Sequence, residues 1–150
     1  MKIFDRFKRP PDLVIGAPPY MRRWYVVPRN NRFNVYFHEI LRSDDDRALH
    51  DHPWAWNLSI VLSGGYFEID RAGRRWVRPG SVRLRRGVFA HRLELRDGVM
   101  ARTLFLTGPR VREWGFLCPQ GWRHWKDFTA FNTTGDSALV GPGCGEGDAP

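Results

Sequence analysis

The chain has 150 residues, a typical length for one domain with a sizeable core. Its 42% hydrophobic and 14% aromatic residues exclude a disordered chain and indicate a packed globular protein. The formal net charge of +8 raises the question of nucleic acid, but the basic residues are nearly all arginines spread along the sequence, without a known nucleic-acid motif. We therefore expect a solvated arginine-rich surface and no nucleic-acid partner. An anionic small-molecule substrate is the next interpretation, because arginine binds carboxylate or phosphate through paired hydrogen bonds.

The sequence contains no apolar run near the roughly 20 residues that a membrane-spanning helix needs. Its first nine residues lack the apolar stretch of a secretory signal. Only two cysteines occur, Cys118 and Cys144, and the second lies in a glycine-rich tail where we do not expect a disulfide. We therefore expect two free thiols in a cytoplasmic protein that does not bind a membrane.

The first 22 residues, with two Pro-Pro pairs and Gly16, predict an irregular N-terminal arm. From Arg23 onward, short segments rich in aromatic and β-branched residues alternate with turn signals, which predicts an all-β domain over residues 23–132. No amphipathic helix is recognisable. Residues 133–150 are rich in Gly and Pro, and we expect a disordered tail there, above all over 141–150. The expected strands cover 24–27, 33–41, 54–63, 66–70, 74–78, 81–85, 90–95, 99–107 and 113–117.

Three turns support this reading. Gly64-Gly65 suits a two-residue hairpin loop, Asp97-Gly98 is typical of a type I′ hairpin, and Pro79-Gly80 indicates a further reversal. Residues 43–47 form a polar, acidic loop that leads into a histidine pair, where a carboxylate could orient a ligand histidine. On the expected strand 81–85, Arg83 and Arg85 share one face and could form a small basic patch.

His50 and His52 are separated by one residue, so in a strand both imidazoles point to the same side. Their Cα atoms would lie roughly 6.5–7 Å apart, which lets two nitrogens reach a shared cation at about 2.0–2.1 Å. His91, from a neighbouring expected strand, would complete one face of a metal site. The alternative is that the three histidines are only hydrogen-bonded within a polar pocket.

The spacing around these histidines extends the pattern. From His50 the sequence reads HxH, four residues, Asn57, six residues and Gly64, and Gly80 precedes His91 by eleven positions. These intervals resemble those of the cupin superfamily, whose motifs are G(X)5HXH(X)3,4E(X)6G and G(X)5PXG(X)2H(X)3N. The chain departs from them in several places, which are Asn57 for the glutamate, Arg86 for the proline, Gly87 one residue early and Leu95 for the final asparagine.

The resemblance implies a single-domain double-stranded β-helix, a jelly-roll barrel with its site inside the mouth. It implies a divalent metal, Fe(II), Mn(II), Ni(II), Cu(II) or Zn(II), held by His50, His52 and His91, with Asn57 at the fourth protein position. The run HDHPW, together with residues 106–110 and 113–116, is also similar to uncharacterised cupin-like proteins of phages and bacteria. That likeness names no reaction.

Other residues have two interpretations each. His38 can line the pocket as an acid or base, or be an ordinary strand histidine. Trp54 and Trp56 share the parity of the histidine pair, so they either wall the pocket or pack in the core. An aromatic group near the C-terminus is expected to form core or a homodimer interface, and it comprises Trp114, Phe116, Trp122, Trp125 and Phe128.

Three functions remain open from the sequence. The first is a metal-dependent enzyme of oxygenase or isomerase type acting on a small, anionic substrate, with no catalytic residue assigned. The second is a metal-free enzyme of nucleotide-sugar epimerase type, which requires a histidine–carboxylate pair in the pocket. The third is a non-catalytic ligand-binding cupin.

Overall fold

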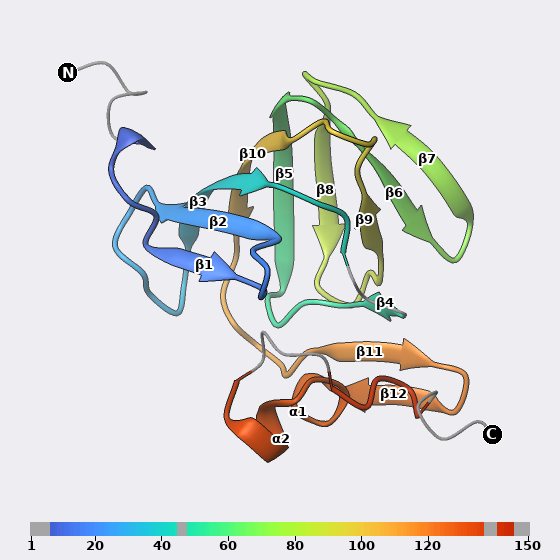
Figure 1. The fold of residues 1–150 in the computed structure, drawn as a ribbon. Coiled ribbons are helices and arrows are strands. Elements are labelled where there is room, and N and C mark those ends of the chain that lie inside the picture. The colour runs from blue at the N-terminus through green and yellow to red at the C-terminus, as the bar shows by residue number, and fades with distance from the viewer. Residues whose placement is uncertain (1–6, 45–47, 137–140, 146–150) are drawn as a thin grey trace.

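The computed structural model describes residues 7–44, 48–136 and 141–145. These residues form twelve short strands and two helices of four residues each, arranged as a barrel with a small layer beneath it (Figure 1). In chain order the elements are β1 (Leu13–Ile15), β2 (Met21–Tyr25), β3 (Asn34–Ile40), β4 (Leu49–His50), β5 (Trp56–Ser63), β6 (Tyr66–Asp70), β7 (Gly73–Val77), β8 (Val82–Arg86), β9 (Arg92–Glu94), β10 (Ala101–Thr107), β11 (Gly115–Cys118), β12 (Gly121–His124), α1 (Trp125–Phe128) and α2 (Phe131–Thr134).

The strands pair into three antiparallel sheets. The largest has the order β1-β2-β3-β10-β5-β8, and the other two have the orders β7-β6-β9 and β12-β11-β4. An apolar core lies between the six-stranded sheet and the β7-β6-β9 sheet, and it comprises Met21, Ile40, Val61, Tyr66, Val77, Leu95 and Ala101. The third sheet and both helices lie beneath this barrel, at the end where β4 runs (Figure 1).

Alternation along the strands determines which side chains reach the barrel interior. In β5, Asn57, Ser59 and Val61 are buried, while the residues between them are more exposed. In β10 the same alternation buries Thr103 and Phe105. Successive side chains of a strand point to opposite faces, so every second side chain of β5 and β10 faces the interior. These inward side chains include both polar and apolar groups.

Every strand that the sequence predicts is present, with ends shifted by up to three residues. Three strands were not predicted, namely β1, β4 and β12, and neither were the two helices. The prediction of an irregular arm over residues 1–22 is wrong for Leu13–Ile15, which pairs with the start of β2. Residues 1–6 of that arm lie outside the described residues.

Neither of two predicted hairpin loops joins a pair of hydrogen-bonded strands. Gly64 and Gly65 form a two-residue turn between β5 and β6 with φ of 77° and 84°, but a hairpin is wrong there, because β5 and β6 belong to different sheets. The type I′ hairpin at Asp97-Gly98 is wrong, since only Gly98 has a positive φ. The flanking strands do not pair with each other either, because β9 pairs with β6 and β10 pairs with β3 and β5.

The prediction of two free thiols is wrong, because Cys118 of β11 and Cys144 form a disulfide across a sequence separation of 26. The bond ties the segment 141–145 to the lower sheet, and Gly143 N–H also donates to Phe128 O. A disordered tail is therefore wrong for residues 133–136, where α2 ends, and for 141–145, whereas 137–140 and 146–150 lie outside the described residues. The disulfide also removes the cysteine argument for a cytoplasmic location.

The aromatic segment near the C-terminus packs mainly inside the molecule. Phe116 and Phe128 are buried and stack at 3.6 Å between ring centroids, and Trp114 stacks on Trp125 at 5.8 Å. Only Trp122 is well exposed among these five. Within the described residues, no helix is long and apolar enough to cross a membrane.

Candidate metal centre in the barrel mouth

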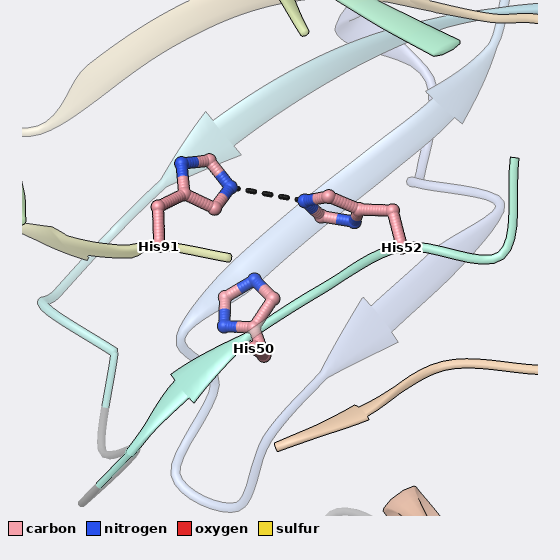
Figure 2. Close-up of side chains that lie close together, drawn as sticks. All are labelled: His50, His52 and His91. Carbon is pink, nitrogen blue, oxygen red and sulfur yellow. Dashed lines mark hydrogen bonds between the residues drawn. The ribbon is translucent and has the colours of Figure 1, made fainter. Parts of the chain in front are cut away.

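The backbone brings the three histidines together. His50 and His91 face each other in a short antiparallel bridge, in which each backbone N–H donates to the other residue's C=O at 3.0 Å. His52 N–H donates to Gly87 O, which fixes the segment that follows β4. A Cβ at Gly87 would lie 1.8 Å from Trp54 O, so only glycine allows this close approach. Figure 2 shows the three imidazoles around one space, with His50 and His52 on the segment that includes β4 and His91 on the segment that faces it.

The ring nitrogens are close enough to share an ion. One nitrogen from each of His50, His52 and His91 lies within 4.8 Å of the other two, so a single point lies within about 2.8 Å of all three. His52 Nε2 and His91 Nε2 are 2.9 Å apart. Two nitrogens at right angles around an ion, each at about 2.1 Å, are separated by about 3.0 Å. The donor set therefore fits a divalent transition metal.

The residue between the two histidines, Asp51, points the other way and anchors the lower sheet. Its carboxylate accepts hydrogen bonds from Gly115 N–H at 2.8 Å and from Trp122 Nε1–H at 3.0 Å, and it pairs with Arg112 at 2.7 Å. Asp51 is buried, so these partners compensate the desolvation of its charge. The alternation of the HxH segment thus attaches the β11–β12 hairpin on one side and presents imidazoles on the other.

A buried carboxylate lies directly behind His91. Glu68 of β6 has no exposed surface, and its Oε1 accepts a hydrogen bond from His91 Nδ1 at 2.7 Å. Arg83 pairs with the same carboxylate at 3.0 Å, and Arg85 also contacts it. Since Nδ1 of His91 donates to Glu68, Nε2 of the neutral ring carries the lone pair that faces His52.

The electrostatics of the site keep the imidazoles of His52 and His91 neutral. Burial, opposed in part by the hydrogen bond to Glu68, lowers the pKa of His91 to about 4. Burial, followed by the charges of His91 and His50, holds the pKa of His52 well below its usual range. For Glu68, burial favours the protonated form, but the hydrogen bond with His91 and the charge of Arg85 prevail and lower its pKa to about 2. The site therefore combines neutral ring nitrogens with an ionised carboxylate behind one of them.

The histidines open into a cavity of about 90 Å³ inside the barrel. Trp54 lines it and stacks on His52 with ring centroids 5.7 Å apart, so the sequence interpretation of a wall is confirmed for Trp54. His38 also lines the cavity, as one of the sequence interpretations proposed. The other lining residues are Tyr20, Met21, Arg23, Ile40, Asp44, Ser59, Tyr66, Leu93, Thr103 and Phe105.

Two candidates from the same segment lie elsewhere. His52 and Trp54 line the cavity, but β5 begins at Trp56 and buries Asn57 and Ser59, so the parity shifts by one residue between Trp54 and Asn57. Trp56 packs against Gly108 instead of walling the cavity. Asn57 is fully buried and is not among the residues that line the cavity. Neither atom of its side-chain amide has a hydrogen-bond partner among the described residues.

The predicted orienting carboxylate and basic patch also have different outcomes. Asp44 accepts a hydrogen bond from Leu93 N–H at 2.7 Å, and Asp45 and Asp46 lie outside the described residues. The carboxylate that orients a histidine is Glu68, which the sequence interpretation missed. Arg83 and Arg85 do share a face, but that face turns inward onto Glu68, so a surface patch is wrong for Arg85.

Glu68 and Arg23 are the functional candidates that sequence reasoning missed. A signal for Glu68 was present, since it occupies the inward parity of an alternating strand, between Tyr66 and Asp70. A glutamate in that position must find cationic or N–H partners. No comparable signal marks Arg23 in a chain with so many arginines.

A scan against protein-family models finds no match, and neither does a search of curated proteins. Solved structures do match. The polyketide cyclase RemF from Streptomyces resistomycificus is 18% identical with a TM-score of 0.58, over 75% of this chain and 81% of that one. A sugar phosphate isomerase of the cupin superfamily from Silicibacter pomeroyi is 15% identical with a TM-score of 0.54, over 77% and 84%. An uncharacterized conserved protein with a double-stranded β-helix domain, from Klebsiella pneumoniae, is 14% identical with a TM-score of 0.56, over 77% and 89%.

These likenesses establish the fold. The chain is an all-β protein with a double-stranded β-helix fold, as its two motifs predict, and solved structures named as cupin superfamily proteins share this fold. At such low identity they carry no activity across, and the likeness to phage proteins stays a prediction.

Proposed function

We propose that this protein is a metal-dependent enzyme that binds a divalent ion through His50, His52 and His91 and acts on a small anionic substrate. The observation that carries the proposal is the convergence of the three ring nitrogens, with Glu68 holding the tautomer of His91. A carboxylate behind a ligand histidine is the usual support of such sites, because it orients the ring and raises its basicity.

A bound divalent ion would supply Lewis acidity to an oxygen of the substrate or lower the pKa of a water molecule. The residues of the chain do the remaining work. Trp54 and Phe105, whose rings are 5.6 Å apart, present aromatic surface to the cavity and exclude water. Tyr66 is buried at the cavity, and burial raises the pKa of its phenol, so it stays protonated and can donate a hydrogen bond.

The reaction class that we propose is that of an isomerase or an oxygenase. His38 does not serve as the base in this proposal, because its Nε2 already accepts a hydrogen bond from Arg23 Nε–H at 2.8 Å. Structural neighbours named as a sugar phosphate isomerase and a polyketide cyclase support the view that such a barrel processes small molecules.

Metal content tests the proposal. We expect the wild-type protein, after dialysis and loading, to retain about one equivalent of Zn(II) or Mn(II), and His50→Ala/His91→Ala to retain less than a tenth of that. His124→Ala is the matched control, because His124 lies near Glu113 at 3.2 Å, outside the cavity. A wild-type protein that binds no divalent ion on titration would defeat the proposal.

A second candidate function is supported by the same pair of residues. His91 and Glu68 form a histidine–carboxylate pair, which is what a metal-free acid–base enzyme of the epimerase type needs. The nearness of two further imidazoles, within 4.8 Å, counts against it, because the acid–base role requires only the pair of His91 and Glu68. A metal-free protein that turns over substrate, loses activity in His91→Ala and keeps it in His50→Ala would favour this second function.

A homodimer is the partner that we propose. The apolar surface available for it lies on the outer face of β5 and β8, where Leu62, Val82 and Leu84 are 42%, 60% and 68% exposed. Exposed apolar groups of this kind commonly mark protein interfaces. We expect Leu84→Asp to shift a dimer to a monomer in light scattering at micromolar concentration, whereas Trp122→Ala leaves the mass unchanged.

A further inference from the structure

An arginine points into the same cavity as the three histidines. Arg23 of β2 lines the cavity, whereas its neighbour Arg22 lies on the opposite face and pairs with Glu39 at 3.6 Å. The alternation of the strand therefore places one guanidinium inside the barrel and one outside.

Two neighbours hold the inner guanidinium in place. Arg23 Nε–H donates to His38 Nε2 at 2.8 Å, and the guanidinium carbon lies 4.6 Å from the centre of the Tyr36 ring. The hydrogen bonds of the described residues use only Nε, so the two terminal nitrogens of Arg23 are available on the cavity side. This leaves the edge of the guanidinium that can bind a carboxylate through two parallel N–H bonds.

Arg23 also differs from the other inward arginines in its counter-charge. Arg83 and Arg85 both pair with Glu68, but no carboxylate of the described residues forms an ion pair with Arg23. Burial lowers the pKa of Arg23, and the main opposing influences come from tyrosines. A partly buried cation without a counter-ion is costly, and an anionic ligand would remove that cost.

The cavity limits what the anion can be. A volume of about 90 Å³ accommodates about six to nine heavy atoms, if each takes the space of one water molecule. The lining also contains Asp44, whose Oδ2 accepts a hydrogen bond from Leu93 N–H. The negative charge of Asp44 in the lining disfavours a dianionic phosphate ester more than a monoanion.

We propose that Arg23 binds the carboxylate of a small monocarboxylic substrate, whose other end lies at His50, His52 and His91. The inference rests on the proposed function, because it takes the histidines as the reactive end of the cavity. His38 acts as a positioning residue, since its Nε2 holds the guanidinium through Nε.

The test uses propionate as the probe and the indole N–H signal of Trp54, which lines the cavity, as the readout in ¹⁵N-labelled protein. Titrations are run on metal-free and on zinc-loaded protein. We expect a saturable shift, weakened at least tenfold in Arg23→Gln and changed less than twofold in Arg22→Gln. Propionamide, which has the same shape without the charge, should cause no shift. If Arg23→Gln fails to fold, Arg23→Lys with an intact amide spectrum replaces it, and at least a threefold weakening is expected.

The outcomes separate the two proposals. Equal weakening in both arginine variants, no shift with propionate, or tighter binding of propionamide or inorganic phosphate would overturn the carboxylate site. If zinc never binds but propionate still depends on Arg23, the metal proposal fails and the carboxylate site stands. If zinc binds at the histidines and Arg23→Gln leaves propionate binding unchanged, the carboxylate site fails and the metal proposal stands.

Discussion

Two walls of the cavity each hold a buried histidine, but with opposite partners. On one wall, His91 donates its Nδ1–H to the carboxylate of Glu68 at 2.7 Å. On the other, His38 accepts at Nε2 a hydrogen bond from the guanidinium of Arg23 at 2.8 Å. The same side chain, equally buried, is thus a donor toward an anion in one place and an acceptor from a cation in the other.

The difference assigns the two walls different tasks. Glu68 leaves the lone pair of His91 Nε2 directed at the space shared with His52, so this wall is suited to a cation. Arg23 occupies the nitrogen of His38 and presents positive charge, so the opposite wall is suited to an anion. A substrate with a carboxylate at one end and a metal-binding oxygen at the other would span both.

Among the substitutions that test this difference between the two walls, Glu68→Gln should have the largest effect on stability and metal affinity. It leaves Arg85, whose side chain is 3% exposed, without its counter-charge, and breaking a buried pair in this way costs about 3–5 kcal/mol. We also expect metal affinity to fall about 10–100-fold, because His91 loses its orienting carboxylate. Urea unfolding and zinc titration measure the two effects.

The matched control is Glu94→Gln, which removes an exposed ion pair with Arg74 and should cost less than about 1 kcal/mol. Equal losses of stability in the two variants would show that the buried carboxylate has no special role. Unchanged zinc affinity in a folded Glu68→Gln protein would separate Glu68 from the metal site.

Acid should weaken the wall that holds His38. Burial and the charge of Arg23 hold the pKa of His38 well below 6.5, so the folded protein binds fewer protons than the unfolded chain at pH 5.5. Stability is therefore lost as pH falls below about 6.5, by about 1.4 kcal/mol per such histidine at pH 5.5. We expect His38→Gln to lose about 1 kcal/mol less than wild type between pH 7.5 and pH 5.5 in urea unfolding. A variant with the same pH dependence as wild type would contradict this account of His38.

Substitution of Asn57 should have the smallest effect on stability and zinc affinity, and it tests whether Asn57 is a metal ligand. Its buried amide lacks hydrogen-bond partners among the described residues, so Asn57→Leu should be neutral or stabilising by about 1 kcal/mol in urea unfolding. Because Asn57 does not line the cavity, zinc affinity should change less than twofold. A tenfold loss of zinc affinity would instead place the amide at the metal.

The HxH pair and its distance from His91 could be predicted because strand alternation and motif spacing are local properties of the sequence. Their convergence needed only one neighbouring strand. Trp54 and Trp56 show where this reasoning stops, since the parity shift before β5 places Trp56 away from the cavity. Near this parity shift the backbone of Gly87 passes close to Trp54, and a contact between such distant parts of the chain cannot be predicted from a local sequence pattern.

Glu68, Arg23 and the disulfide depend on pairings between distant parts of the chain. Glu68 meets His91 because β6 pairs with β9, whereas the sequence favoured a hairpin between β9 and β10. The disulfide forms because the C-terminal tail returns to β11. The low complexity of that tail predicts disorder instead. The charged partners of a buried site are thus fixed by topology, and the histidines themselves by spacing.

The most direct measurement is anomalous scattering from crystals of the zinc-loaded protein, collected on both sides of the metal absorption edge. The account predicts one strong peak at about 2.0–2.2 Å from a ring nitrogen of each of His50, His52 and His91. A peak elsewhere, or no peak with His52 Nε2 and His91 Nε2 still joined by a hydrogen bond, would contradict it.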